Sequence, residues 1–167
     1  MATSNMQELL NSLPQTGKII WMGLRPGFRE PLLEVEEALI TEEEGLVGDH
    51  YKAAGKKRQV TLIQAEHLEA VARMLQRDRI DPGLTRRNLV VSGINLLALQ
   101  DRRFRLGEVL LEMTGLCHPC SRMEENLGPG GYNAMRGHGG ITARVIEGGT
   151  IRPGDAVRLE QPDKIKT

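Results

Sequence analysis

The apolar residues of this chain come in short runs that end at glycine, proline or charged residues, and this pattern constrains the fold more than any other feature. Such runs, bounded by turn residues, are typical of β-strands. With about seven of them and no regular alternation of strand and helix, the sequence predicts a mostly β, α+β fold: a single curled, mostly antiparallel barrel with helices on its outside. The predicted strands are residues 18–24, 33–40, 59–64, 87–91, 105–113, 141–146 and 156–159.

Helical periodicity is clearest in residues 65–77, where Leu68, Val71, Ala72 and Leu75 form one apolar stripe. The 167 residues suit one domain. We expect an N-terminal arm or short helix over residues 1–17, one domain over 18–160 and a C-terminal tail over 161–167. Shorter helical turns are expected at residues 96–99 and after Pro119, where Gly128 ends the helix.

The charge balance excludes several classes of partner. Lys and Arg total 22, as do Asp and Glu, so no overall field favours nucleic acid or a membrane surface. No stretch has the apolar length to span a bilayer, and the N-terminus has no basic, apolar leader. Two cysteines without such a leader fit a reducing compartment. We therefore expect a cytoplasmic protein that binds neither nucleic acid nor membrane.

Both cysteines lie in the stretch 111–127, three residues apart. Proline is favoured at the first helical position, so Pro119 predicts that Cys120 takes the second. Backbone N–H groups and the helix dipole at that position favour a thiolate. Cys120, Met123 and Leu127 follow helical spacing, so we expect Cys120 to point inward. The stretch thus predicts one activated sulfur, with Cys117 nearby.

The pair of cysteines allows four interpretations. Two packed thiols are common, but a strand-to-helix junction beside proline is a poor place for them. A thioredoxin-like dithiol needs a parallel strand–helix–strand context that the pattern lacks. A zinc site needs four ligands, and the four histidines offer no pair at ligand spacing. The fourth is a single thiolate that binds a soft metal supplied by a cofactor.

Glycine-rich loops with basic neighbours predict an anion site. We expect a long polar loop over residues 45–58, and residues 127–140 hold six glycines. Glycine turns expose N–H groups that can form anion nests, although simple turns are commoner. A convergence of basic residues from separate loops would indicate a phosphate. The candidates are Lys56, Lys57, Arg58, Arg86, Arg87 and Arg136.

Six segments together resemble the MOSC domain in order and spacing, over roughly residues 18–160. This is the C-terminal domain of molybdenum cofactor sulfurases, and it also occurs alone in bacteria and in the mitochondrial amidoxime-reducing component. The segments are GLVGDH at 45–50, RQVTLI at 58–63, RRNLVVSGI at 86–94, FRLG at 104–107, residues 111–122 with Pro119-Cys120, and residues 136–155.

The resemblance implies a β-barrel-like fold and a molybdenum cofactor, a pyranopterin dithiolene that carries a phosphate. It also implies that Cys120 is the ligand to the metal or the acceptor of transferred sulfur, and that arginines and loop backbone hold the pterin. Because a phosphate favours planar, bidentate donors, we expect Arg58, Arg87 and Arg136 to clamp the cofactor. Asp49 and Asn88 are the expected polar partners of the pterin edge.

By the same resemblance we expect a small oxidoreductase module that reduces N-hydroxylated compounds. The sequence shows no pyridoxal-phosphate desulfurase domain and no ferredoxin-like cysteine motif. From its length we also expect it to lack the extra N-terminal barrel of the amidoxime-reducing enzymes. We therefore expect a separate reductase or sulfur donor protein, and no pyridoxal phosphate. Two alternatives stay open: a sulfur carrier with a persulfide on Cys120, and a non-catalytic cofactor- or anion-binding module. Cys117 is outside the family pattern and is expected to be secondary.

Overall fold

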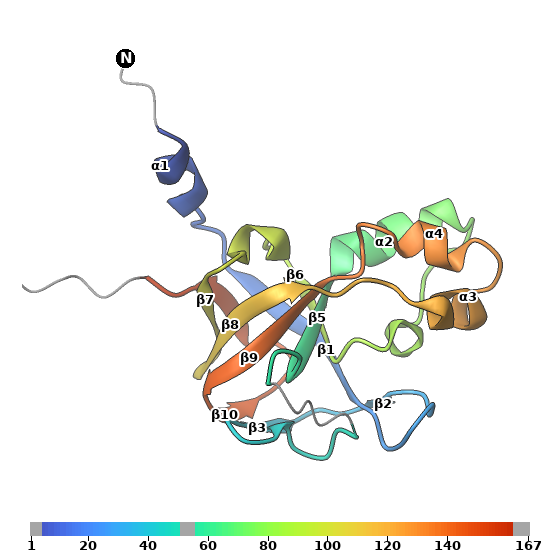
Figure 1. The fold of residues 1–167 in the computed structure, drawn as a ribbon, viewed down its shortest axis with the longest axis horizontal. Helices are drawn as coiled ribbons and strands as arrows, with labels where there is room; N and C mark the ends of the chain where they lie inside the picture. The colour runs from blue at the N-terminus through green and yellow to red at the C-terminus, as the bar shows by residue number, and fades with distance from the viewer. Residues whose placement is uncertain (1–4, 51–55, 162–167) are drawn as a thin grey trace, which may run out of the picture.

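The computed structural model describes residues 5–50 and 56–161. The ends of the predicted arm and tail, and residues 51–55 of the predicted loop, lie outside this part. Within it, seven strands form a closed barrel, because the first strand pairs with the last through Gly17–Val157 and Lys18–Ala156 (Figure 1). In spatial order they are β11 (Ala156–Leu159), β7 (Arg103–Leu106), β8 (Val109–Leu116), β9 (Ile141–Glu147), β5 (Val60–Gln64), β6 (Leu89–Ser92) and β1 (Gly17–Leu24).

Neighbouring barrel strands are antiparallel except β5 and β6, which run parallel and are joined through α2 (Ala65–Met74). This single crossover explains why every residue of β5 is buried. Val60 and Leu62 pack inside the barrel, whereas Ile63 packs under α2. A strand covered on both faces is a continuous apolar run rather than an alternating one. The predicted barrel with peripheral helices is confirmed.

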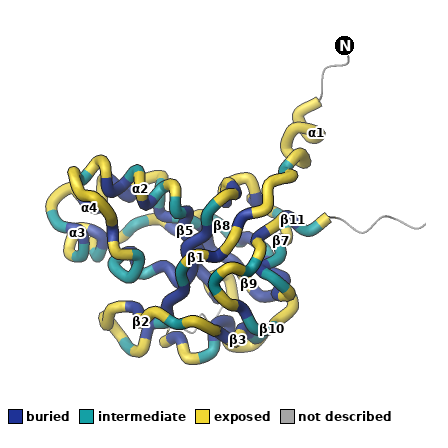
Figure 2. Tube along the Cα trace, turned by 180° about the vertical axis from the view of Figure 1, so that it is seen from behind, coloured by how far each residue is buried: buried dark blue, intermediate teal, exposed yellow. Residues whose placement is uncertain are grey.

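The core has two parts. One fills the barrel, and the other lies between the barrel wall and the helices α2, α3 (Ser121–Leu127) and α4 (Gly131–Met135), which gather on one side (Figure 1). Figure 2 shows the buried segments concentrated along the strands. The second cluster is built from Ile63, Leu68, Val71, Ala72, Ile80, Val90, Met123, Leu127, Ala134 and Met135.

Two of the predicted strands are wrong, because each is interrupted in the structure. Residues 33–40 form β2 (Leu33–Glu34), which pairs with β1, and β3 (Ala38–Thr41), which joins β4 (Gly45–Leu46) and β10 (Gly149–Ile151) in a second sheet. The chain leaves one sheet for the other between them. Residues 105–113 instead contain the β7–β8 turn. Gly107 makes that turn with φ +56°, a region that favours glycine.

The remaining helices are short. Helix α1 (Met6–Asn11) begins with an Asn5–Glu8 capping box and is exposed along its length (Figure 2). The 3-10 helices are η1 (Pro82–Thr85) and η2 (Leu96–Leu99). The sequence did not predict α4, because its glycines resemble a turn. In fact Gly131 lets α4 approach α3: an added Cβ would lie 2.6 Å from the Met123 carbonyl oxygen. None of the described helices is long and apolar enough to cross a membrane.

A histidine pair forms where α2 meets the segment after α4. The rings of His67 and His138 contact edge to face, with centroids 5.1 Å apart. The pKa of His67 is lowered, first by burial and then by the positive charge of His138, while Glu66 opposes the shift. The folded protein therefore resists protonation of His67 more than the unfolded chain does.

This pair predicts a pH dependence of stability. Because the unfolded chain binds the proton more readily, the contribution of His67 is fully present above the ordinary histidine pKa of about 6.5 and is lost as the pH falls below it. Urea unfolding at pH 7.5 and pH 5 should show a smaller loss of stability on acidification in His67→Gln than in the wild type. His118→Gln, at an exposed histidine, serves as control. Equal losses in all three proteins would contradict the prediction.

Candidate functional site

The two cysteines lie on the loop that connects β8 to α3, and they differ in exposure. Cys120 is exposed at the N-cap of α3, whereas Cys117 is 2% exposed, and both are free thiols. The prediction that Cys120 takes the second helical position and points inward is wrong. Its backbone is extended (φ −125°, ψ 179°) and the helix begins only at Ser121, so the inward spacing of Met123 and Leu127 does not reach Cys120.

Cys117 provides the buried sulfur instead. Its backbone N–H donates to the Gly140 carbonyl at 2.8 Å, and Arg58 Nη2 donates to its Sγ at 3.6 Å. A buried thiol within reach of a guanidinium is a feature that the sequence analysis missed. Nothing in the sequence indicated it, because the predicted strand ends at residue 113, whereas β8 continues to Leu116, directly before Cys117.

Arg87 lies behind this loop and is 4% exposed. Its Nη2 donates to the carbonyls of Cys117 (3.1 Å) and His118 (3.2 Å). Its Nε donates to Gly139 O at 2.8 Å and its Nη1 to Thr85 O at 2.9 Å. Burial lowers the pKa of Arg87, and the nearby Cys117 opposes that shift. Since most of its five donors already bind backbone, direct contact of Arg87 with a phosphate stays a prediction.

Asp49 and Asn88 belong to a buried polar network. Arg25 donates to Asp49 through Nε (3.2 Å), Nη2 (2.9 Å) and its backbone N–H (2.8 Å). Asn88 Nδ2 donates to Asp49 Oδ1 at 3.2 Å, and Thr61 Oγ1 donates to Asn88 Oδ1 at 3.0 Å. Arg25 was not predicted as a site residue, because an arginine before Pro-Gly resembles a turn and nothing in the sequence pairs it with a carboxylate 24 positions later.

The surroundings of the cysteines are positively charged. Arg86 lies in the left-handed region (φ 60°) and its Nη1 donates to the Glu30 carbonyl at 3.1 Å. Burial lowers the pKa of Arg86, and the positive charges of Arg25 and Arg122 lower it further, while Cys120 raises it. Arg122, in the first turn of α3, stands 5.8 Å from the exposed Phe28 ring. We call Arg25, Arg58, Arg86, Arg87 and Arg122 the arginine cluster.

The structure therefore brings most of the predicted site residues together. Arg58 and Arg87 contact the cysteine loop, and the charges of Asp49 and Cys120 both act on Arg86. Arg136 is exposed at the C-terminal end of α4. Among the described residues, no hydrogen bond or ion pair of its side chain connects it to the arginine cluster.

Glycines allow the loop after α4 to pack against the cysteine loop. A Cβ on Gly139 would lie 2.0 Å from the Cys117 carbonyl oxygen, and one on Gly140 would lie 1.9 Å from that of Leu62. These backbone contacts leave no room for a side chain. A cavity of about 160 Å³ lies beside them, lined mainly by Leu97, Leu116, Cys117, His118, Pro119 and Gly139.

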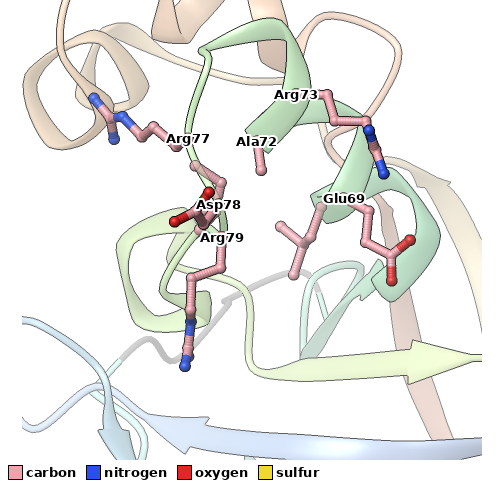
Figure 3. A pocket seen from close by; sticks show the side chains of 8 residues that line it. Glu69, Ala72, Arg73, Arg77, Asp78 and Arg79 are labelled. Atoms are coloured by element: carbon pink, nitrogen blue, oxygen red, sulfur yellow. The ribbon is translucent and has the colours of Figure 1, made fainter.

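A larger hollow of about 480 Å³ lies elsewhere, along α2 and the segment that follows it (Figure 3). Its arginines and acidic side chains project in different directions rather than toward one point. Arg77, for example, donates to the Leu127 carbonyl. In the described part of the chain, no three His, Cys, Asp or Glu side chains are grouped to hold a metal ion.

Comparison with solved structures places the barrel among small bacterial proteins. The crystal structure of the YuaD protein from Bacillus subtilis is similar with a TM-score of 0.76 and 17% identity, over 91% of this chain and all of the other. YiiM from Escherichia coli gives 0.66 and 21%, over 87% of this chain and 70% of YiiM. YiiM from Geobacillus stearothermophilus gives 0.68 and 16%, over 87% and 75%. At these identities the likeness shows the fold.

The family follows from the sequence. The model of the MOSC domain matches residues 49–158, and this chain belongs to the MOSC domain family. None of the curated proteins with which the chain was compared matches it significantly. The family predicted from the six segments is thus confirmed.

The polar network predicts a large loss of stability when Asp49 is removed. Truncating one partner of a buried ion pair leaves the other charge without compensation, which costs about 3–5 kcal/mol. Asp49→Ala should lower the free energy of unfolding by that amount in urea denaturation. Asp78→Ala removes an exposed carboxylate and should stay within about 0.5 kcal/mol of the wild type. A loss in Asp49→Ala no larger than in Asp78→Ala would contradict this role.

Proposed function

We propose that this chain binds a molybdenum cofactor with the Cys120 thiolate as the protein ligand to the metal. We further propose that it works as a small oxidoreductase module that reduces N-hydroxylated compounds with electrons from a separate reductase. The observation that carries the proposal is an exposed thiol in a MOSC family barrel, close enough to Arg86 and Arg87 of the arginine cluster for its charge to act on both. Each feature alone is common, and their coincidence at one rim supports a cofactor with both a soft metal and an anionic group.

The residues present fit such a group. A thiolate is a soft ligand, and the Cys120 side chain accepts no capping hydrogen bond from the backbone N–H groups of α3, so its sulfur is not committed to the helix. The positive charges of Arg25 and Arg122 disfavour a charged Arg86. A bound phosphate would relieve this repulsion, because an anion next to guanidinium groups favours their charged form.

The side chains would divide the work by exposure. Cys120 would hold the metal, and Arg58, which is exposed, would contribute charge to the phosphate. Asp49 and Asn88 are buried and already bonded, so they would support the loops that receive the pterin edge. When bound, the cofactor supplies two-electron oxygen-atom chemistry, while the protein fixes its orientation and excludes water.

Replacement of Cys120 tests the proposal most directly. Serine is a hard, poor substitute for a thiolate ligand, so Cys120→Ser should lose most of its molybdenum and its activity while the fold is kept. Cys117→Ala should keep most of both. Elemental analysis and pterin fluorescence per chain, on protein made in a cofactor-competent host, give the readout.

The outcomes also separate the alternatives. Full metal content and activity in Cys120→Ser would refute the assignment. A persulfide on Cys120 without bound pterin would favour the sulfur carrier. Bound cofactor without turnover would leave a binding module. An obligatory Cys117–Cys120 disulfide cycle, detected by mass spectrometry, would revive the dithiol interpretation.

The predicted clamps give a second test. Charge-assisted hydrogen bonds contribute about 1.5–3 kcal/mol each, so Arg58→Ala, Arg87→Ala and Arg136→Ala should each weaken cofactor retention about 10-fold or more. Pterin bound per chain after dialysis is the measurement. Arg158→Ala, at an exposed position on β11, is the control and should retain the cofactor. Unchanged occupancy in all three clamp variants would end the idea of an arginine clamp.

A further inference from the structure

Arg87 connects three segments that are far apart in the sequence. It stands just before β6, and its guanidinium donates to the carbonyls of Thr85, Gly139, Cys117 and His118 at 2.8–3.2 Å. The Cys117 acceptor belongs to the loop between β8 and α3, the cysteine loop, and the Gly139 acceptor belongs to the loop after α4, which we call the glycine loop. The two loops also bond directly, because Cys117 N–H donates to Gly140 O at 2.8 Å. Arg87 therefore holds together the two loops on either side of its side chain.

The chemistry of arginine fixes the geometry of this contact. Its guanidinium is planar, with five donors in a rigid fork, whereas lysine has one compact ammonium on a flexible stem. A buried cation is costly unless its donors are satisfied. Four carbonyls satisfy Arg87 at 4% exposure, so neither the side chain nor its acceptors can move independently.

We propose that Arg87 is the positioning residue for Cys120. By fixing the carbonyls of Cys117 and His118, it determines where the next two residues, Pro119 and Cys120, leave the barrel rim. It also keeps the Cys117 sulfur buried beside Arg58, so that only Cys120 is presented to a ligand. The importance of Cys120 in this inference rests on the proposed function, but the positioning itself does not depend on a bound cofactor.

A second position should act in the same way. Gly139 packs between the two partners, because an added Cβ would lie 2.0 Å from the Cys117 carbonyl oxygen and 3.2 Å from Arg87 Nη2. The clash with backbone forces the loops apart. Gly139→Ala therefore disturbs the contact of Arg87 with the two loops without changing any charge.

The test is native-state alkylation of the full, cofactor-free chain with iodoacetamide, with each cysteine followed separately by mass spectrometry. In the wild type, Cys120 should react and Cys117 should be protected. In Arg87→Lys and Gly139→Ala, Cys117 should react about 10-fold faster or more, as expected when hydrogen bonds to a charged donor are lost. Val157→Ala, in the barrel core away from the loop, controls for a general loss of stability.

The comparison is made at urea concentrations that give the variants equal stability. If Cys117 then reacts as fast in Val157→Ala as in the other two, Arg87 has only a structural role and the proposal is overturned. If neither loop variant folds, the urea dependence of Cys117 labelling in the wild type decides. If Arg87 holds the two loops together, the rate of Cys117 labelling should depend on urea concentration as steeply as global unfolding does. A labelling rate that does not depend on urea would refute the proposal. Loss of the proposed cofactor function would alter none of these results.

Discussion

The arrangement of the loops at the barrel rim depends on how the charges of two buried guanidinium groups are stabilised. A charge out of contact with water is costly unless it is paired or fully hydrogen-bonded. Arg25 is paired with the Asp49 carboxylate, whereas Arg87 is satisfied by backbone carbonyls alone. The Arg25–Asp49 ion pair joins the segments that follow β1 and β4, and Asn88 connects both residues to β6. The hydrogen bonds of Arg87 join the start of β6 to the cysteine loop and the glycine loop.

The functional residues of the rim therefore fall into two groups, one buried and one exposed. Arg25, Arg87, Asp49 and Asn88 are buried and hold loops in place, while Arg58 and Cys120 are exposed. The two cysteines follow the same division, since Cys117 packs inward and Cys120 is exposed at the N-cap position of α3. A spacing that suggests a matched dithiol pair thus holds two sulfurs in different environments. This difference in exposure is why we propose only one of them as a ligand.

The sequence predicted what depends on local patterns. Short apolar runs that end at glycine turns predicted most strands, and the apolar stripe of residues 65–77 predicted α2. The orientation of Cys120 was missed because helical spacing cannot decide whether a helix begins one or two residues later, and that shift moves a side chain from the inner to the outer face. The Arg25–Asp49 pair and the carbonyl acceptors of Arg87 depend on loops that meet only in three dimensions. Glycine content likewise could not distinguish the turn at Gly107 from the helix contact at Gly131.

The seam between β1 and β11 has a consequence for how the protein is made. It consists of the pairs Gly17–Val157 and Lys18–Ala156, from opposite ends of the barrel sequence. During synthesis β1 leaves the ribosome long before its partner exists, so its free edge stays open until almost the whole domain has emerged. Folding dominated by such distant pairs is slow, and unpaired edges invite association with other chains. Closure of the barrel is therefore the last step at which a nascent chain can be lost to aggregation.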